Sequence, residues 1–149
     1  MKKIIIHIGT QKTGSTSIQT FSSINHKELL SCGVFYPMIG RNPPFISKEE
    51  GIIINGDFLR EKKYSKILHL HLNNFEKSKC HTMFLSEEGL TGAGPISNYN
   101  LKVYQELGEY DVKVIVYLRR ATEYLASFWQ ECIRNKHLVG DLNAFIKKS

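Results

Sequence analysis

The chain has 149 residues, of which 42% are hydrophobic and 23% are charged. These proportions are those of an ordinary globular domain, and they exclude a disordered, fibrous or low-complexity chain. The formal net charge of +6 favours an anionic partner and leaves nucleic acid, a phosphorylated nucleotide and a sulfated sugar open. No apolar run approaches the roughly 20 residues of a membrane helix, so we expect no membrane span.

The apolar pattern predicts strands that alternate with helices. In chain order we expect a buried strand over 3–8, a loop over 9–14 and a helix from residue 15 to Gly33, with Ile18, Phe21 and Leu29 on one side. An extended piece over 33–37, a surface loop over 37–57 and a helix over 58–79 follow. The rest of the chain predicts a core strand over 82–86, a helix over 98–109, a core strand over 112–118 and a helix over 122–136. This alternation predicts an α/β fold with a central parallel sheet and helices on both faces, in one domain spanning 1–149.

Cysteine and histidine spacing argues against metal binding. Cys32, Cys80 and Cys132 are widely spaced and form no CxxC pair, so we expect reduced thiols in a cytoplasmic protein. Among six histidines only His69 and His71 lie close together, and no cysteine lies within ligand spacing of them, so we expect no metal site. The basic residues form no known nucleic-acid module, and we expect no nucleic-acid partner.

The loop between the first strand and the first helix has the residues of an anion site. The N-terminus of a helix attracts an anion through its backbone N–H groups and its dipole. Gly9 and Gly14 let the backbone bend closely around a ligand, Ser15 and Thr16 add hydroxyl donors, and Lys12 adds a full positive charge. We therefore expect a phosphate-like group to bind here.

This loop differs from a Walker A motif at one decisive position. Gly9 and Gly14 have the spacing of GxxxxGK[ST], but Ser15 stands where that motif has its lysine. A nucleoside triphosphatase needs that lysine on the β- and γ-phosphates and an acidic residue near Mg²⁺, and neither core strand ends in such an aspartate. We expect binding without magnesium, with a magnesium-dependent small-molecule or nucleotide kinase as the alternative.

A second group of anion-binding residues follows the strand over 112–118. Arg119 and Arg120 stand at the carboxyl end of this strand, where ligands bind in open α/β sheets. Arginine recognises phosphate through planar, bidentate hydrogen bonds. Ser127 follows Arg119 by eight residues, about two turns into the next helix, and can offer a hydroxyl to the same anion.

Together these two segments resemble the signatures of the sulfotransferases that use 3′-phosphoadenosine 5′-phosphosulfate (PAPS), the bacterial and carbohydrate-type enzymes in particular. The family's first signature, Lys-[Ser/Thr]-Gly-[Ser/Thr]-Thr between a strand and a helix, reads Lys12-Thr13-Gly14-Ser15-Thr16 here. The second, an arginine at a strand end with a serine eight positions later, reads Arg119 and Ser127. The resemblance covers residues 3–131 and implies a three-layer P-loop-like fold that lacks the family's C-terminal part.

The resemblance implies transfer of a sulfuryl group from PAPS to a hydroxyl or amine, here of a carbohydrate, without a metal and with adenosine 3′,5′-bisphosphate as product. Lys12 would stabilise the negative charge that grows on the bridging oxygen. Arg119 and Ser127 would hold the 3′-phosphate. The residues of the loop and helix start that would bind the donor are Gln11, Lys12, Thr13, Gly14, Ser15 and Thr16.

The general base is a separate expectation. Glu87 and Glu88 follow the second core strand, and we expect one of them to act as the base or to bind the acceptor. His26 and the pair at 49–50 are weaker candidates. Because family members are longer than this chain, a truncated, non-catalytic nucleotide-binding domain stays open as a third interpretation.

Overall fold

The structure is a computed structural model that describes residues 1–9, 14–38, 65–86, 105–134, 141 and 143. In these ranges the elements are β1 (Lys3–Gly9), α1 (Ser15–Ile24), α2 (His26–Ser31), β2 (Val34–Phe35), α4 (Ser65–Lys77), β3 (Thr82–Ser86), β4 (Asp111–Tyr117) and α6 (Ala121–Arg134). The predicted alternation of strands and helices is confirmed. The expected loop over 37–57 and the helix over 98–109 lie largely outside the described residues.

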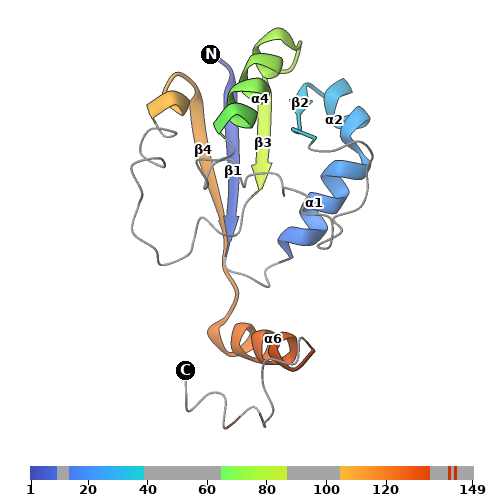
Figure 1. Ribbon diagram of the computed structural model, residues 1–149, viewed down its shortest axis with the longest axis vertical. Coiled ribbons are helices and arrows are strands. Elements are labelled where there is room, and N and C mark those ends of the chain that lie inside the picture. The colour runs from blue at the N-terminus through green and yellow to red at the C-terminus, as the bar shows by residue number, and fades with distance from the viewer. Residues whose placement is uncertain (10–13, 39–64, 87–104, 135–140, 142, 144–149) are drawn as a thin grey trace.

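The four strands form one parallel sheet in the order β2-β3-β1-β4 (Figure 1). β1 lies between β3 and β4, and each pairing has a continuous register. His7 lies beside Ser86 of β3, and Gly9 lies beside Tyr117 of β4. Because all pairings are parallel, the carboxyl ends of the strands lie at the same edge of the sheet, which confirms the predicted α/β class with a parallel sheet.

The hydrophobic core lies on one face of this sheet, under α4. Its buried members are Ile4 and Ile6 of β1, Leu68, Leu72 and Phe75 of α4, Cys80, Met83 and Leu85 in or just before β3, and Leu107. Alternate residues of a strand point to one face, and the helix contributes positions i, i+4 and i+7, so the strands and α4 each offer one apolar side. Each large side chain buried here stabilises the fold by roughly 1.5–3 kcal/mol.

The helix that follows β1 differs from its prediction in two ways. It ends at Ile24, and α2 begins at His26. At the break the side-chain amide of Asn25 donates to Phe21 O at 2.8 Å, an oxygen that also accepts the last helix bond from Asn25 N. Its apolar side also does not enter the core, since Phe21 is 62% exposed. The buried residues of α1 are Ser15, Gln19 and Ser22. Gln19 Nε2 donates to Ser86 O of β3 at 3.3 Å, so this side of the helix meets polar groups that need partners.

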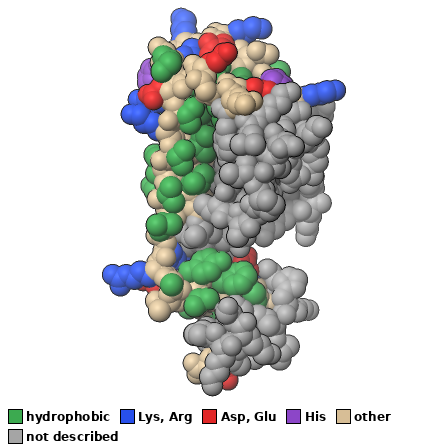
Figure 2. Space-filling view, turned by 90° about the vertical axis from the view of Figure 1, so that its left-hand side faces the viewer, with side chains coloured by type: hydrophobic (Ala, Val, Ile, Leu, Met, Phe, Trp, Pro, Cys, Tyr) green, Lys and Arg blue, Asp and Glu red, His purple; other side chains and the backbone are tan. Residues whose placement is uncertain are grey.

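The prediction that residues 112–118 form a strand is confirmed as β4, but the prediction that this strand is buried is wrong. Its apolar residues are exposed, and Val114 is 55% exposed. β4 is the last strand in the described sheet, and Figure 2 shows hydrophobic side chains along this side of the molecule. α6 lies beyond the carboxyl ends of the strands and has no buried residue (Figure 1).

Candidate functional site

The predicted strand–loop–helix unit lies at the carboxyl edge of the sheet. β1 ends at Gly9, and α1 begins at Ser15 after Gly14, whose φ is 88° and whose ψ is 12°. This left-handed conformation favours glycine. Gly14 has no side chain to cap the helix, and the first helix bonds run from Ser17 N and Ile18 N to Gly14 O at 3.0 and 3.2 Å. The positive end of the helix dipole therefore lies at the sheet edge, in a position suited to an anion.

The predicted donor-binding residues of this unit have different exposures. Ser15 is buried, at 1% exposure, and Thr16 is exposed. The hydroxyl of Thr16 can therefore meet a ligand at the surface, whereas Ser15 is part of the packed interior. Residues 11–13, which include the predicted Gln11, Lys12 and Thr13, lie outside the described residues.

The second predicted segment leaves the sheet beside the first. Gly9 pairs with Tyr117, so the chain after β1 and the chain after β4 depart from neighbouring strands at one edge. Arg119 follows Tyr117 by two residues, and its Nε donates to Glu123 Oε2 at 3.4 Å. Both side chains are partly exposed, and such surface ion pairs contribute little to stability. This partly exposed guanidinium is accessible to a ligand phosphate.

The remaining predicted site residues do not all lie at the carboxyl edge of the sheet. Ser127 is half-buried in α6, and Arg120 is exposed. His26 begins α2, at the far end of α1 from Ser15, so the structure does not bring it to the carboxyl edge. Glu87 and Glu88 lie outside the described residues, as do residues 49–50. In the sequence the two glutamates come directly after Ser86, the last residue of β3.

A polar cluster that was absent from the sequence predictions lies at the same edge, and all its members except Tyr117 are buried. It consists of His7, Gln19, Ser86 and Tyr117, and we call it the His7 cluster. His7 Nδ1 lies 2.9 Å from Ser86 Oγ, and Gln19 Nε2 donates to Ser86 O at 3.3 Å. The rings of His7 and Tyr117 meet edge to face with centroids 4.6 Å apart. One signal could have revealed it, since His7 interrupts a run of isoleucines in a core strand.

Burial determines the charge state of the His7 cluster. His7, Gln19 and Ser86 are 2%, 4% and 0% exposed. Because burial disfavours the charged imidazolium, the pKa of His7 lies below its ordinary value. His7 is therefore neutral near pH 7, with one ring nitrogen as donor and the other as acceptor.

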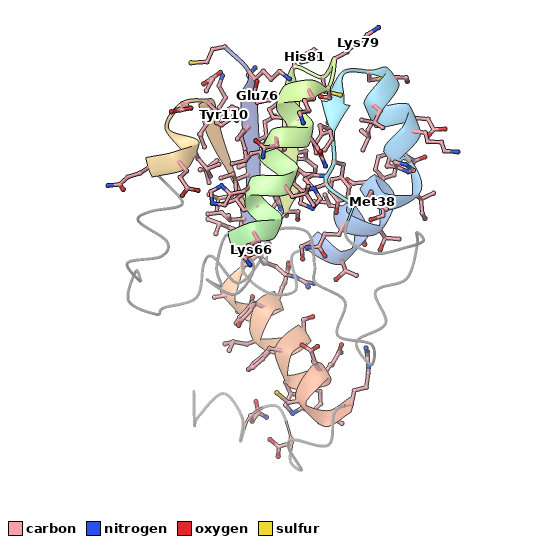
Figure 3. The ribbon with its side chains drawn as sticks, turned by 45° about the horizontal axis from the view of Figure 1, so that its top comes forward. Met38, Lys66, Glu76, Lys79, His81 and Tyr110 are labelled. Carbon is pink, nitrogen blue, oxygen red and sulfur yellow. The ribbon has the colours of Figure 1, made fainter. Side chains whose placement is uncertain are left out.

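The end of the molecule opposite the carboxyl edge has side chains that support the fold. Figure 3 shows Lys66 at the lower end of α4, toward the carboxyl edge, and Glu76 and Tyr110 at the other end. Burial and the hydrogen bond to Glu76 raise the pKa of Tyr110 to about 12. Tyr110 therefore stays protonated near pH 7. Its hydrogen bond with Glu76 joins α4 to the chain before β4, which is a structural arrangement rather than a ligand site.

Metal binding finds no support in the part of the chain that the structure describes, where no three His, Cys, Asp or Glu residues are grouped to hold an ion. His69 is exposed, with Nε2 3.8 Å from Glu106 Oε2, whereas His71 is buried. The two imidazoles thus have separate surroundings on α4.

Comparisons with protein-family models, curated proteins and solved structures gave no match. None of the helices in the described ranges combines the length and the hydrophobicity needed to cross a lipid bilayer. The carboxyl edge of the sheet is therefore the feature from which a function can be inferred.

Proposed function

We propose that this chain is a PAPS-dependent sulfotransferase that acts on a hydroxyl or amine of a carbohydrate. The observation that carries this proposal is the pairing of Gly9 with Tyr117. In this pairing β1, which precedes α1 in the chain, and β4, which precedes Arg119, end side by side at one sheet edge. PAPS has anionic groups on both its 5′ and its 3′ oxygens, and two adjacent anion-binding segments suit such a ligand.

The proposed reaction is an in-line displacement at sulfur. The acceptor oxygen or nitrogen forms a bond to sulfur, and the bond from sulfur to the bridging oxygen of the donor breaks. The electron pair of that bond stays on the oxygen, which leaves as the 5′-phosphate of adenosine 3′,5′-bisphosphate. The acceptor proton passes to Glu87 or Glu88, and Lys12 offsets the charge on the leaving oxygen.

The same proposal extends to the whole domain. We infer a three-layer, P-loop-like arrangement over 1–149, which is supported by the packing of α4 on the core face and by the hydrogen bond from Gln19 of α1 to Ser86 on the other. A cytoplasmic location is supported by Cys32, Cys80 and Cys132, which are free thiols.

Calorimetric titration tests nucleotide recognition, with adenosine 3′,5′-bisphosphate and AMP added in EDTA and ATP added in Mg²⁺. We expect adenosine 3′,5′-bisphosphate to bind more tightly than AMP, because only the bisphosphate engages Arg119. Arg119→Ala should weaken bisphosphate binding by about tenfold or more, whereas Arg134→Ala, at an exposed position in the last turn of α6, should not. A preference for ATP with Mg²⁺ would instead indicate a kinase, and the absence of all binding would refute the proposal.

Turnover tests the role of the loop lysine. With PAPS and a panel of oligosaccharide acceptors, Lys12→Ala should lower kcat by about a hundredfold or more, since a fixed cation acts mainly on the transition state, and bisphosphate binding should survive in part. Lys79→Ala, an exposed lysine at the opposite end of the molecule (Figure 3), is the matched control. Unchanged turnover in Lys12→Ala would remove this residue from the mechanism.

A further inference from the structure

His7 occupies a special position in the sheet. It is the third-last residue of β1, and its neighbours in register are Ser86 on β3 and Ile115 on β4. Its side chain lies on the face covered by α1, since Gln19 of that helix reaches the same Ser86. The imidazole is therefore enclosed between the central strand and the helix whose N-terminus lies at the carboxyl edge.

The hydrogen bonds around Ser86 suit a tautomer of His7 in which Nδ1 accepts. Gln19 Nε2, which can only donate, also approaches Ser86 Oγ, at 3.5 Å. The Ser86 hydroxyl can then donate its own hydrogen to His7 Nδ1, which lies 2.9 Å away. With Nδ1 as acceptor, the hydrogen of the neutral ring is on Nε2.

The Nε2 atom is the unusual part of this arrangement. It is buried, and it has no hydrogen-bond partner among the described residues. Nε2 is farther from Cβ than Nδ1 is, and side chains stand roughly perpendicular to a sheet, so it points off the strand on the side of α1. A buried N–H without a partner destabilises a fold, and such groups mark sites where a ligand or a bound water completes the hydrogen bonding.

We propose that His7 is a ligand-binding residue whose Nε2–H donates a hydrogen bond to an oxygen of a phosphate or sulfuryl group seated at the carboxyl edge. This inference rests on the proposed function for the identity of the ligand. Ser86 and Gln19 are then positioning residues, because they hold the ring in the tautomer that donates. A neutral donor adds directional recognition beside the cations of the site without repelling them.

Two variants of similar shape test the roles of the two ring nitrogens of His7 separately. His7→Asn keeps an amide near the position of Nδ1 and removes the group at Nε2, whereas His7→Gln places its amide near Nε2. We expect His7→Asn to weaken binding of adenosine 3′,5′-bisphosphate by about tenfold or more and His7→Gln to stay within about threefold of the wild type. His71→Asn, at a buried position on α4, should leave binding unchanged. Equal affinities in His7→Asn and the wild type would overturn the proposal.

Nitrogen NMR of the ¹⁵N-histidine-labelled wild-type protein gives a readout that needs no stable variant. At neutral pH we expect His7 Nδ1 without a proton and Nε2 with one, and a shift of the Nε2 signal as the bisphosphate saturates the protein. If the bisphosphate binds and Nε2 does not respond, the role of His7 is refuted and the proposed function stands. If only inorganic sulfate or phosphate binds and moves Nε2, the nucleotide donor is refuted and the role of His7 stands. If the bisphosphate, inorganic sulfate and inorganic phosphate all leave the Nε2 signal unmoved, the role of His7 is refuted.

Discussion

Gly33 lies between α2 and β2 in a conformation that other residues adopt only at a cost, with φ of 77°. A Cβ atom here would lie 2.5 Å from His81 Nε2 and 2.7 Å from Cδ2. The backbone cannot move away easily, because Gly33 O accepts from His81 N and Thr82 N at 3.0 and 3.2 Å. We expect Gly33→Ala to lower the free energy of unfolding by about 2 kcal/mol or more, measured by urea denaturation.

Gly14 provides the control for this substitution. Its φ of 88° is similar, but a Cβ there would meet no atom of the described part of the chain within 4 Å. Gly14→Ala should therefore lower the free energy of unfolding only by the cost of the left-handed backbone conformation, about 1 kcal/mol. Adding His81→Ala to Gly33→Ala should restore part of the loss. An equal loss in both alanine variants would mean that the His81 ring turns aside despite its 3.0 Å contact with Thr82 Oγ1.

At the scale of elements, Lys2 caps the end of α4 from a distant part of the sequence. Its Nζ donates to Phe75 O, to Glu76 O at 3.0 Å and to Ser78 O at 3.1 Å, and it lies 4.5 Å from the centroid of the Phe75 ring. A cation at these carbonyls satisfies acceptors that a helix leaves unpaired and opposes the negative end of its dipole. We expect Lys2→Met to lower the free energy of unfolding by about 1–2 kcal/mol.

Lys79→Met is the matched control for this cap, since Lys79 lies at the same end of the molecule and is exposed (Figure 3). Its effect on thermal or urea unfolding should stay within about 0.5 kcal/mol. Similar losses in the two methionine variants would show that Lys2 acts through general charge rather than through the carbonyls.

β4 presents an exposed apolar strip at the last position of the described sheet, as Figure 2 shows. Exposed strands of this kind favour association between chains. We expect Val114→Lys to lower light scattering of concentrated solutions and to change the free energy of unfolding by less than about 1 kcal/mol. Ile6, the register partner of Val114, is only 3% exposed, so Ile6→Lys should prevent folding. Unchanged scattering in Val114→Lys would mean that this strip does not drive association.

At the scale of the whole molecule, two buried histidines make stability depend on pH. Burial lowers the pKa of His7 and of His71, whereas the unfolded chain titrates near 6.5. Below that pH the two histidines bind protons in the unfolded chain, whereas in the native state they stay neutral to a lower pH. Their contribution to stability is therefore complete above about pH 6.5 and declines as the pH falls.

Replacing both residues, His7→Asn with His71→Asn, should make this decline shallower between about pH 7 and pH 5, as measured by urea denaturation at several pH values. His69→Asn, at an exposed position, is the control. An unchanged slope in the double variant would show that neither buried imidazole limits stability in acid.

The sequence predicted those parts of the candidate site that depend on local order. Gly14 and Ser15 lie where a glycine turn enters a helix, and Arg119 follows a strand, as expected. Their roles toward a ligand stay predictions. The pairing of His7 with Ser86 was not foreseen, because it joins residues that are 79 positions apart and depends on which strands become neighbours.

For the fold as a whole, the residue pattern by itself determined the strands and their parallel arrangement, because runs of β-branched residues favour buried strands and alternation with helices requires crossovers. Only the tertiary structure decided the strand order, the rotation of α1 that buries Gln19 and exposes Phe21, and the exposure of β4. These features depend on which surfaces meet. A helix buries the side whose hydrogen bonds and shape fit its neighbour, and that neighbour comes from a remote part of the chain.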